Sequence, residues 1–401
     1  MQVLDGIRVL DLSQFLSGPR ASQLLAMFGA EVLKIEPPAG DSMRMLLTLS
    51  GSERTMSCLH QNKKSLVIDL NSPAGREVFL QLVDVSDVLI ENLTPGSMDK
   101  LELSWDLLRR RNPRLIYACI SGFGRSGPLS NRTAFDIISQ ATGGTMYGNG
   151  IPDRPPGVFF GDLCSGESCA FGILLALMAR EKTGSGQLID ISMQDVMYFH
   201  NFWGFSEKAT RPVKDEIVSI FGRDVTRLLT DYEHPMAFWN SYRASDGYVA
   251  VVALSDRQWN RLMEVIGRAD LIGDPRFDDF ISRVRNADEA RPIIAKWMGR
   301  HSQAQIIEAL SEKRIPCGKV QDYEQLNNDP QLDARGMYRT VNHPRLGEID
   351  VPGIPVKLSA TPGEICKPCP DLGQDTAEAL SRVLGLTEEQ VAELVKDGVV
   401  L

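Results

Sequence analysis

Residues 6–36 read GIRVLDLSQFLSGPRASQLLAMFGAEVLKIE and predict a βαβ unit. The apolar run over 7–12 is typical of a buried strand, and apolar residues then follow helical spacing over 21–28. Gly29 marks the end of this helix, and a second strand is predicted over 31–35. Strands joined through a helix run parallel, because a parallel pair needs a long crossover connection.

Similar units follow along the chain. Helices are predicted over 73–83 and 105–111, each preceded by a serine that can cap it. They alternate with apolar strands over 87–93 and 114–121. This alternation predicts an α/β domain with a Rossmann-like open parallel sheet that helices cover on both faces.

The chain is predicted to form two domains. The large domain begins with residues 1–204, and a linker is predicted over 205–235, where periodicity fades and charges mix. A smaller α+β domain follows over 236–325, and an Asp-Gly pair at 246–247 predicts a hairpin within it. Residues 326–401 are predicted to return as a second linker and the C-terminal part of the large domain.

Composition excludes several classes of protein. The formal net charge of −9 argues against a general nucleic-acid binder, because phosphate backbones are bound by clustered Lys and Arg. The longest apolar stretch, over 169–179, is short of the ~20 residues that a membrane-spanning helix needs. Seven cysteines, an odd and scattered set, do not indicate a disulfide-stapled fold. We therefore expect a soluble, cytoplasmic protein.

Common cofactor and metal motifs are missing. Gly18 is the one glycine of a G-x-G-x-x-G fingerprint in the turn after the first strand, so a dinucleotide site is not predicted. Cys366 and Cys369 form one C-x-x-C pair, but no second pair completes the four ligands of a structural zinc site. We expect no metal site.

The segment FFGDLCSG over 159–166 precedes a helix predicted over 167–180, which is apolar on almost every side and therefore predicted to be buried. Asp162 would lie just before this helix and could cap its free N–H groups. The helix N-terminus also favours an ionised carboxylate, which can act as a nucleophile. Gly161 and Gly166 would then leave room for a bulky thioester. The local pattern leaves both interpretations open.

A wider set of motifs resembles the class III CoA-transferase family, which includes formyl-CoA transferase and carnitine CoA-transferase and has α-methylacyl-CoA racemase as a relative. The resemblance runs nearly end to end. Its motifs are GIRVLD (6–11), SGP (17–19), FGAEVLKIE (28–36), NKKS (62–65), ENLTPG (91–96), NPRLIY (112–117), SGFG (121–124), GD (161–162) and KTGSGQ (182–187).

The resemblance implies a reaction and an assembly. The aspartate of the Gly-Asp motif, here Asp162, would attack an acyl-CoA thioester and carry the CoA to a carboxylic acid through anhydride and aspartyl-CoA intermediates. Succinyl-CoA is an expected donor, and neither a metal nor a redox cofactor is needed. Two chains would interlock as a homodimer or pair with a related chain.

The resemblance also implies a CoA site on the large domain. Its residues would be Phe15, Leu16, Ser17, Leu70, Asn71, Asn92, Leu93, Thr94, Lys100, Arg132, Thr133, Ala134 and Phe135. Among these, Lys100 and Arg132 would pair with phosphate groups, and the alternative is that they are solvated surface cations.

Departures from the family pattern bear on specificity. The racemase branch carries a histidine base where this chain has Phe135, and because a phenyl ring cannot take a proton, racemisation is disfavoured. Leu16 replaces a glutamine often seen in formyl-CoA transferase, which makes formate or oxalate a doubtful substrate. A non-catalytic subunit of a heteromeric transferase is the remaining alternative, and the presence of Asp162 argues against it.

Four aromatic residues suggest a hypothesis about the acceptor acid. Phe159 and Phe160 lie beside Asp162 in the sequence, and Trp203 and Phe205 follow. They predict an acceptor with an apolar or aromatic body, while core packing explains them equally well.

Overall fold

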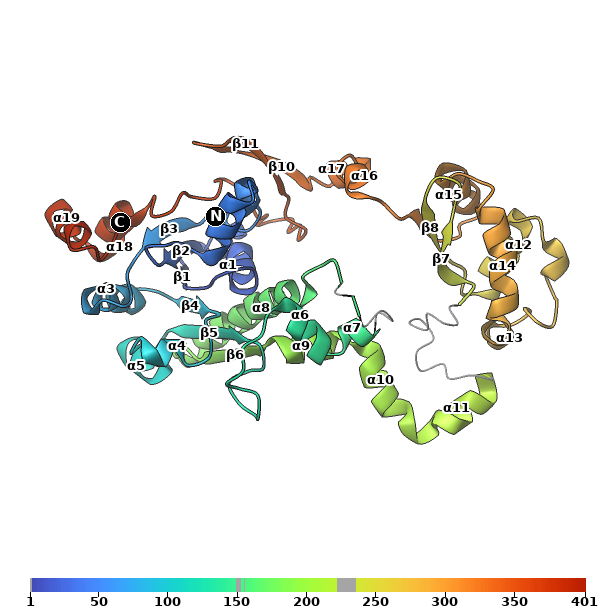
Figure 1. Cartoon of the computed structure of the whole chain (residues 1–401), viewed down its shortest axis with the longest axis horizontal. Coiled ribbons are helices and arrows are strands. Elements are labelled where there is room, and N and C mark those ends of the chain that lie inside the picture. Colours follow the sequence, from blue (N-terminus) through green and yellow to red (C-terminus); the bar gives the residue numbers. More distant parts are fainter. Residues whose placement is uncertain (1, 149–152, 155, 222–235) are drawn as a thin grey trace. The chain divides into compact units, whose positions relative to one another are not determined.

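The computed structural model of the chain describes residues 2–148, 153–154, 156–221 and 236–401. The chain divides into two compact units, coloured along the sequence in Figure 1. The first contains Met1–Thr145, Pro155–His200 and Pro330–Leu401, and the second contains Met146–Arg154 and Asn201–Asp329. The domain boundaries predicted from the sequence remain a prediction.

Six strands form the sheet of the first unit. Their spatial order is β3 (Lys64–Val67), β2 (Glu31–Glu36), β1 (Arg8–Asp11), β4 (Val88–Glu91), β5 (Ile116–Ser121) and β6 (Leu188–Ser192). Every neighbouring pair is parallel. The predicted open parallel sheet is confirmed.

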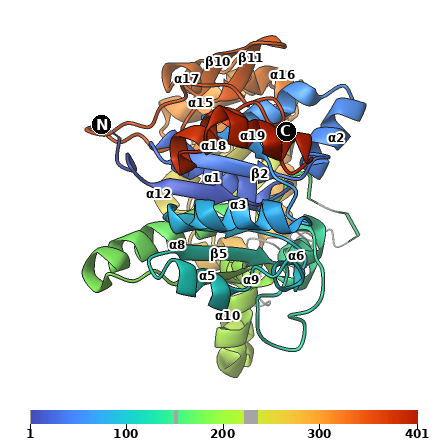
Figure 2. The same ribbon diagram turned by 90° about the vertical axis from the view of Figure 1, so that its left-hand side faces the viewer.

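Helices cover both faces of this sheet, because alternate residues of each strand point to opposite faces. On one face, Leu10 and Leu33 pack with α3 (Pro73–Asp84), α5 (Trp105–Arg111), α18 (Thr376–Leu384) and α19 (Glu388–Lys396). On the other face, Val9 and Val32 pack with α1 (Ser17–Met27) and α8 (Phe160–Thr183). Figure 2 shows α3, α18 and α19 on the near side of the strands.

Helix α8 is longer than predicted and is buried on one side. Its buried stripe, which includes Cys169 and Ile173, packs against α1 and the sheet. Phe171, Leu175 and Met178 on its other side are 62%, 50% and 63% exposed. The prediction of a helix buried all round is therefore wrong. Helix α8 is also long and apolar enough to span a membrane, a test that core helices of soluble proteins pass as well.

Shorter elements complete the first unit. They are α2 (Ser42–Leu49), η1 (Glu53–Cys58), α4 (Ser97–Lys100), α6 (Asp136–Thr142), α9 (Met193–His200), α17 (Pro330–Ala334) and an antiparallel hairpin of β10 (Tyr338–His343) and β11 (Gly347–Pro352). The short helix α7 (Thr145–Gly148) begins at the boundary between the units. The C-terminus returns to the large sheet, where Val400 bridges Ile68 beside β3.

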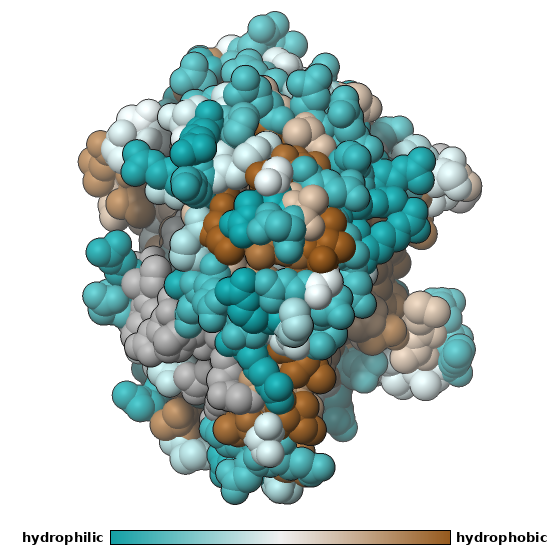
Figure 3. All heavy atoms as spheres, turned by 90° about the vertical axis from the view of Figure 1, so that its right-hand side faces the viewer, coloured by the Kyte–Doolittle hydropathy of each residue, from teal (hydrophilic) through white to brown (hydrophobic). Residues whose placement is uncertain are grey.

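The second unit is built on a three-stranded sheet of β7 (Trp239–Arg243), β8 (Tyr248–Val252) and β9 (Cys317–Lys319). Strands β7 and β8 are antiparallel and flank the Asp-Gly pair, so the predicted hairpin is confirmed. Its helices are α10 (Phe202–Thr210), η2 (Arg211–Val213), α11 (Lys214–Phe221), α12 (Asp256–Val265), η3 (Ala269–Leu271), α13 (Phe280–Arg285), α14 (Ala287–Met298), α15 (Gln303–Glu312) and α16 (Tyr323–Leu326). Figure 3 views the molecule from the side of this unit, where hydrophilic residues cover most of the surface.

The segment predicted as a linker contains helices. Most of α10 and all of η2 and α11 fall within 205–221, and residues 222–235 lie outside the described residues. Sequence periodicity missed these helices because each is short, and an amphipathic pattern needs several turns to be recognised.

Candidate active site

The candidate site is a cavity at the carboxyl ends of β1, β4 and β5. The strand order places β1 and β4 side by side where the chain reverses its direction across the sheet, and such a point leaves a crevice in open α/β folds. The cavity has a volume of about 440 Å³. It is lined by Gln14, Phe15, Ser17, Asn92, Leu93, Thr94, Pro95, Ser97, Ile120, Ser121, Gly122, Arg132, Thr133, Ala134, Phe135, Asp162 and Met193.

The loop after β1 forms one wall of this cavity. Asn92, which follows β4, holds the loop by accepting from the backbone N–H of Gln14 and donating to its carbonyl, both at 2.7 Å. The Asn92 amide also donates to the Ser17 hydroxyl oxygen at 3.0 Å. Ser17 and Asp162 both line the cavity, and the Ser17 hydroxyl acts to lower the pKa of the Asp162 carboxyl. One amide after β4 therefore fixes both the loop and the Ser17 hydroxyl in the cavity wall.

Asp162 lies inside the first turn of α8 rather than before it. The helix begins at Phe160, Phe159 is its N-cap residue, and no side chain caps it. The prediction that Asp162 precedes the helix and could cap it is therefore wrong. The carboxyl group instead reaches the cavity, since Asp162 is among the lining residues.

Two glycines of this segment allow close helix packing. A Cβ atom at Gly161 would lie 2.1 Å from the Ser139 hydroxyl, and one at Gly166 would lie 2.4 Å from the carbonyl oxygen of Ser17. These contacts bring α8 against α6 and against the first turn of α1. The glycines therefore make room for neighbouring helices, and the expectation that they leave room for a thioester is wrong.

Asp136 anchors the first turn of α8. Its Oδ1 accepts the backbone N–H of Asp162 at 3.1 Å, and its Oδ2 accepts the side-chain amide of Gln140 at 2.6 Å. Gln140 also donates to the carbonyl of Val158 at 3.1 Å. Helix α6 thus holds both sides of the Asp162 turn, and it places a second carboxylate next to the first.

The environment of Asp162 works against its ionisation. Burial raises the pKa of Asp162 to about 7, the neighbouring charge of Asp136 adds to the rise, and the hydrogen bond from Ser17 lowers it. The sequence predicted a carboxylate kept ionised by the helix N-terminus. That prediction is corrected: burial and a like charge outweigh the helix dipole, and the group titrates near neutral pH.

The structure brings most of the predicted CoA residues together. Phe15, Ser17, Asn92, Leu93, Thr94, Arg132, Thr133, Ala134 and Phe135 all line the cavity with Asp162. Leu16, Leu70, Asn71 and Lys100 are not among its described lining residues. Leu70 is buried in the core of the sheet, whereas Asn71 and Lys100 are exposed. Their part in binding CoA stays a prediction.

The aromatic residues proposed to contact the acceptor are not gathered in this cavity. Phe159 and Phe160 are 56% and 45% exposed and do not line it. Phe205 belongs to the second unit, and the side chain of Trp203 lies outside the described residues. The aromatic rings in the cavity wall are Phe15 and Phe135, which meet edge to face with centroids 5.5 Å apart.

Sequence reasoning missed several lining residues. Gln14, Pro95, Ser97, Ser121, Gly122 and Met193 line the cavity but were not predicted, and neither was the role of Asp136. The sequence did contain a signal for these lining residues, because most of them follow the ends of strands β1, β4, β5 and β6. In the part of the chain that the structure describes, no three His, Cys, Asp or Glu side chains are grouped to hold a metal ion.

The sequence matches a family model over nearly its whole length. The model is that of CoA-transferase family III, and it covers residues 4–376.

Curated relatives cover the chain almost completely. The chain is 35% identical over 399 residues to a succinyl-CoA–D-citramalate CoA-transferase of Chloroflexus aurantiacus, an alignment that covers 98% of this chain and 96% of that protein. It is 34% identical to a formyl-CoA:oxalate CoA-transferase of Streptomyces avermitilis over the full length of both. It is 34% identical to the alpha subunit of a succinyl-CoA–L-malate CoA-transferase of Chloroflexus aurantiacus, covering 98% of this chain and 91% of that one.

A solved structure also resembles this fold. The crystal structure of a CaiB/BaiF family protein from Brucella suis superposes with a TM-score of 0.79 at 28% identity. The match covers 95% of this chain and 99% of that chain.

Proposed function

Because this chain belongs to CoA-transferase family III, we propose that it moves coenzyme A from an acyl-CoA donor to a carboxylic acid, with Asp162 as the nucleophile. One observation carries the proposal. The Asp162 carboxyl lies in a 440 Å³ cavity at the switch point of the sheet, among nine residues proposed from family resemblance to bind CoA. An ordinary helix-capping aspartate has no reason to face such a cavity.

The first half of the reaction would load CoA onto Asp162. An ionised Asp162 oxygen attacks the thioester carbonyl of the donor, the C–S bond breaks, and a mixed anhydride and CoA thiolate form. The thiolate then attacks the Asp162 carbonyl of that anhydride. The donor acid leaves as a carboxylate, and Asp162 is left as a thioester of CoA.

The second half reverses these steps with the acceptor. The acceptor carboxylate attacks the Asp162 thioester, which gives a second anhydride and releases the thiolate. The thiolate attacks the acyl carbonyl of the acceptor, and the new acyl-CoA and the free Asp162 carboxylate are formed. Each step exchanges one acyl bond for another, so no electron transfer and no metal ion are required.

The elevated pKa of Asp162 suits this sequence. A carboxylate that is less stabilised by its surroundings is a stronger nucleophile, and a pKa of about 7 still leaves a large ionised fraction at neutral pH. Water would hydrolyse the anhydrides, so the proposed reaction requires that the bound substrates exclude water from the cavity.

Substrate identity is proposed from the relatives and from the cavity. Two of the relatives are named for succinyl-CoA, so we propose succinyl-CoA as the donor. Arg132 is a cation in the cavity wall and is proposed to pair with a phosphate of CoA. Phe135 also lines the wall and offers no base for moving an α-proton, which favours transfer over racemisation.

We further propose that the chain works as an interlocked dimer or with a related chain. Apolar side chains that remain exposed on the described chain support this, including Ile137 and Ile138 on α6 and Phe171 and Met178 on α8. One relative is named as an alpha subunit, which makes a related partner chain a reasonable second form. Light scattering on the purified chain should give roughly twice the 44.4 kDa of one copy if the homodimer forms.

Mass spectrometry tests the proposed nucleophile. The protein is mixed with succinyl-CoA, quenched in acid and digested, and the peptide that contains Asp162 is expected to carry a CoA thioester. The Asp162→Asn variant is the matched control and should carry none. Turnover without an adduct on this peptide, or with an adduct on another carboxylate, would contradict the proposal.

A further inference from the structure

The cavity wall formed by residues 13–17 has a shape that its own residues do not favour. Phe15 has a φ of 60°, in the left-handed region that non-glycine residues rarely adopt. Its ring and that of Phe135 both line the cavity. Contacts from outside the loop must therefore stabilise this conformation.

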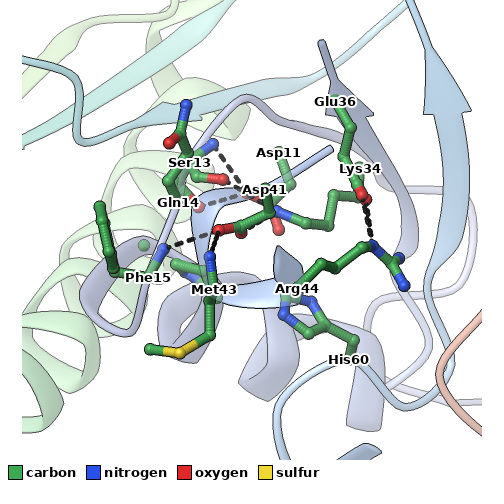
Figure 4. Close-up of polar contacts among 12 residues, drawn as sticks. Asp11, Ser13, Gln14, Phe15, Lys34, Glu36, Asp41, Met43, Arg44 and His60 are labelled. Carbon is green, nitrogen blue, oxygen red and sulfur yellow. Dashed lines mark hydrogen bonds and ion pairs between the residues drawn. The ribbon is translucent and has the colours of Figure 1, made fainter. Parts of the chain in front are cut away.

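A buried ion pair contacts the loop from the side of β2. The Lys34 ammonium lies 3.0 Å from Asp41 Oδ2, and the two side chains are 1% and 0% exposed. Lys34 also donates to the carbonyl oxygen of Ser13 at 2.8 Å. Asp41 Oδ1 accepts the backbone N–H groups of Met43 at 2.9 Å and Phe15 at 3.3 Å, as Figure 4 shows. The pair therefore binds the loop at Ser13 and at Phe15.

Asp11, at the end of β1, extends this support beneath the loop. It accepts the backbone N–H of Ser13 at 3.1 Å and pairs with the ammonium of Lys63 at 3.0 Å. Burial acts to lower the pKa of Lys34, but the carboxylates of Asp11, Asp41 and Glu36 outweigh it and raise that pKa. Lys34 is thus a charged donor at neutral pH.

A role in positioning the loop explains the buried pair of Lys34 and Asp41 better than a role in stability does. Burying an ion pair costs desolvation free energy that its attraction barely offsets, and an apolar pair of similar volume is often as stable. An apolar pair could not bond Ser13 and Phe15. Asn92 holds Gln14 from the other side, so the loop is clamped between β2 and β4.

We propose that Lys34 and Asp41 are positioning residues for acyl-CoA, which hold the Phe15 loop in the shape that the cavity needs. The proposal rests on the proposed function, since it takes the cavity to be the acyl-CoA site. Neither side chain lines the cavity, so both act through the loop.

The test replaces the pair by apolar residues, in the double variant Lys34→Met with Asp41→Leu. Calorimetry measures the Kd for free CoA, which probes the cavity without chemistry, and steady-state kinetics with succinyl-CoA give KM and kcat. We expect Kd and KM to rise roughly tenfold, because a misplaced loop loses contacts, while kcat changes less than about threefold. A merely structural role would change the urea midpoint and leave Kd unchanged.

The matched control removes an ion pair at the amino end of β4, opposite to the end that carries the cavity. Arg180 and Asp87 are 2.9 Å apart there, and the double variant Arg180→Met with Asp87→Asn should keep the wild-type Kd. The single variant Asp41→Asn keeps the side-chain volume, and should raise Kd about threefold even if the first double variant fails to fold. Wild-type Kd and KM in these Lys34 and Asp41 variants would overturn the proposal, while the proposed function would stand. A wild-type protein that binds no CoA would overturn both.

Discussion

Two carboxyl groups lie near the carboxyl ends of the strands of the large sheet, Glu91 buried and Asp162 partly buried, and they differ in how they are hydrogen-bonded. Glu91, the last residue of β4, accepts the Tyr117 hydroxyl at 2.9 Å on one oxygen and the backbone N–H of Leu93 at 2.8 Å on the other. Asp162 has no such pair of hydrogen bonds within the described residues, and the Ser17 hydroxyl acts to lower the pKa of its carboxyl. Glu91 faces a cavity of about 200 Å³, and Asp162 faces one of about 440 Å³.

Burial raises the pKa of both groups. A raised pKa therefore does not by itself distinguish a reactive carboxyl from a structural one. Both oxygens of Glu91 are used to join β4, β5 and the loop after β4, whereas Asp162 keeps an oxygen that can form a covalent bond. Free oxygen atoms in a sufficiently large cavity are the distinguishing property.

The largest expected effect separates the two groups by activity. Asp162→Ala should lower kcat by at least about 10³-fold, because a covalent nucleophile has no substitute in the cavity. Steady-state transfer of CoA from succinyl-CoA measures it, with circular dichroism and urea unfolding to show that the variant is folded. A folded variant with near wild-type turnover would contradict the assignment of Asp162 as the nucleophile.

The next effect concerns pH. Because Asp162 must be ionised to attack, kcat/KM should be full above its pKa of about 7 and fall about tenfold per pH unit below it. Asp136→Asn removes the neighbouring negative charge and should move the midpoint to lower pH. The pH profile of kcat/KM is the measurement, and a midpoint that stays unchanged in this variant would exclude Asp136 as a cause of the shift.

The free energy of unfolding should change in opposite directions in variants of Asp162 and of Glu91. The folded pKa of Asp162 is above its ordinary value of 3.8, so ionisation disfavours folding at pH 8, and Asp162→Asn should raise the free energy of unfolding by about 1–2 kcal/mol. Glu91→Gln also removes a charge that burial disfavours, but it disturbs the two hydrogen bonds that this carboxylate accepts. The loss of these bonds should lower the free energy of unfolding by about 1–2 kcal/mol. Urea unfolding at pH 8 measures both free energies. Changes in the same direction in the two variants would contradict the proposed difference between Asp162 and Glu91.

The smallest effect compares cations beside the two cavities. Arg132 lines the Asp162 cavity and Arg125 lines the Glu91 cavity. Arg132→Ala should raise KM for succinyl-CoA about threefold to tenfold through loss of a phosphate contact, and Arg125→Ala should leave it unchanged. Lys100→Ala tests the remaining cation proposed from resemblance. If Arg125→Ala raised KM as much as Arg132→Ala, the two cavities would have to be treated as one binding surface.

Local pattern was enough to predict the elements that carry the site. Strands such as β1 and β5 are short apolar runs between turn residues, and their parallel pairing follows from the helices between them. The family motifs then placed Asp162 and nine lining residues in one site, although Leu16, Leu70, Asn71 and Lys100 were grouped with them and do not line the cavity.

The tertiary structure alone decided the chemical state of that site. The pKa of Asp162 depends on its burial and on the nearby charge of Asp136, and the shape of the Phe15 loop depends on Lys34, Asp41 and Asn92. Desolvation and Coulomb interactions depend on distances in space, and the residues concerned come from separate strands and helices. The sequence therefore determined which elements form and which carboxyl is the candidate nucleophile. Folding decided how far that carboxyl is buried, which charges surround it and whether it is free to react.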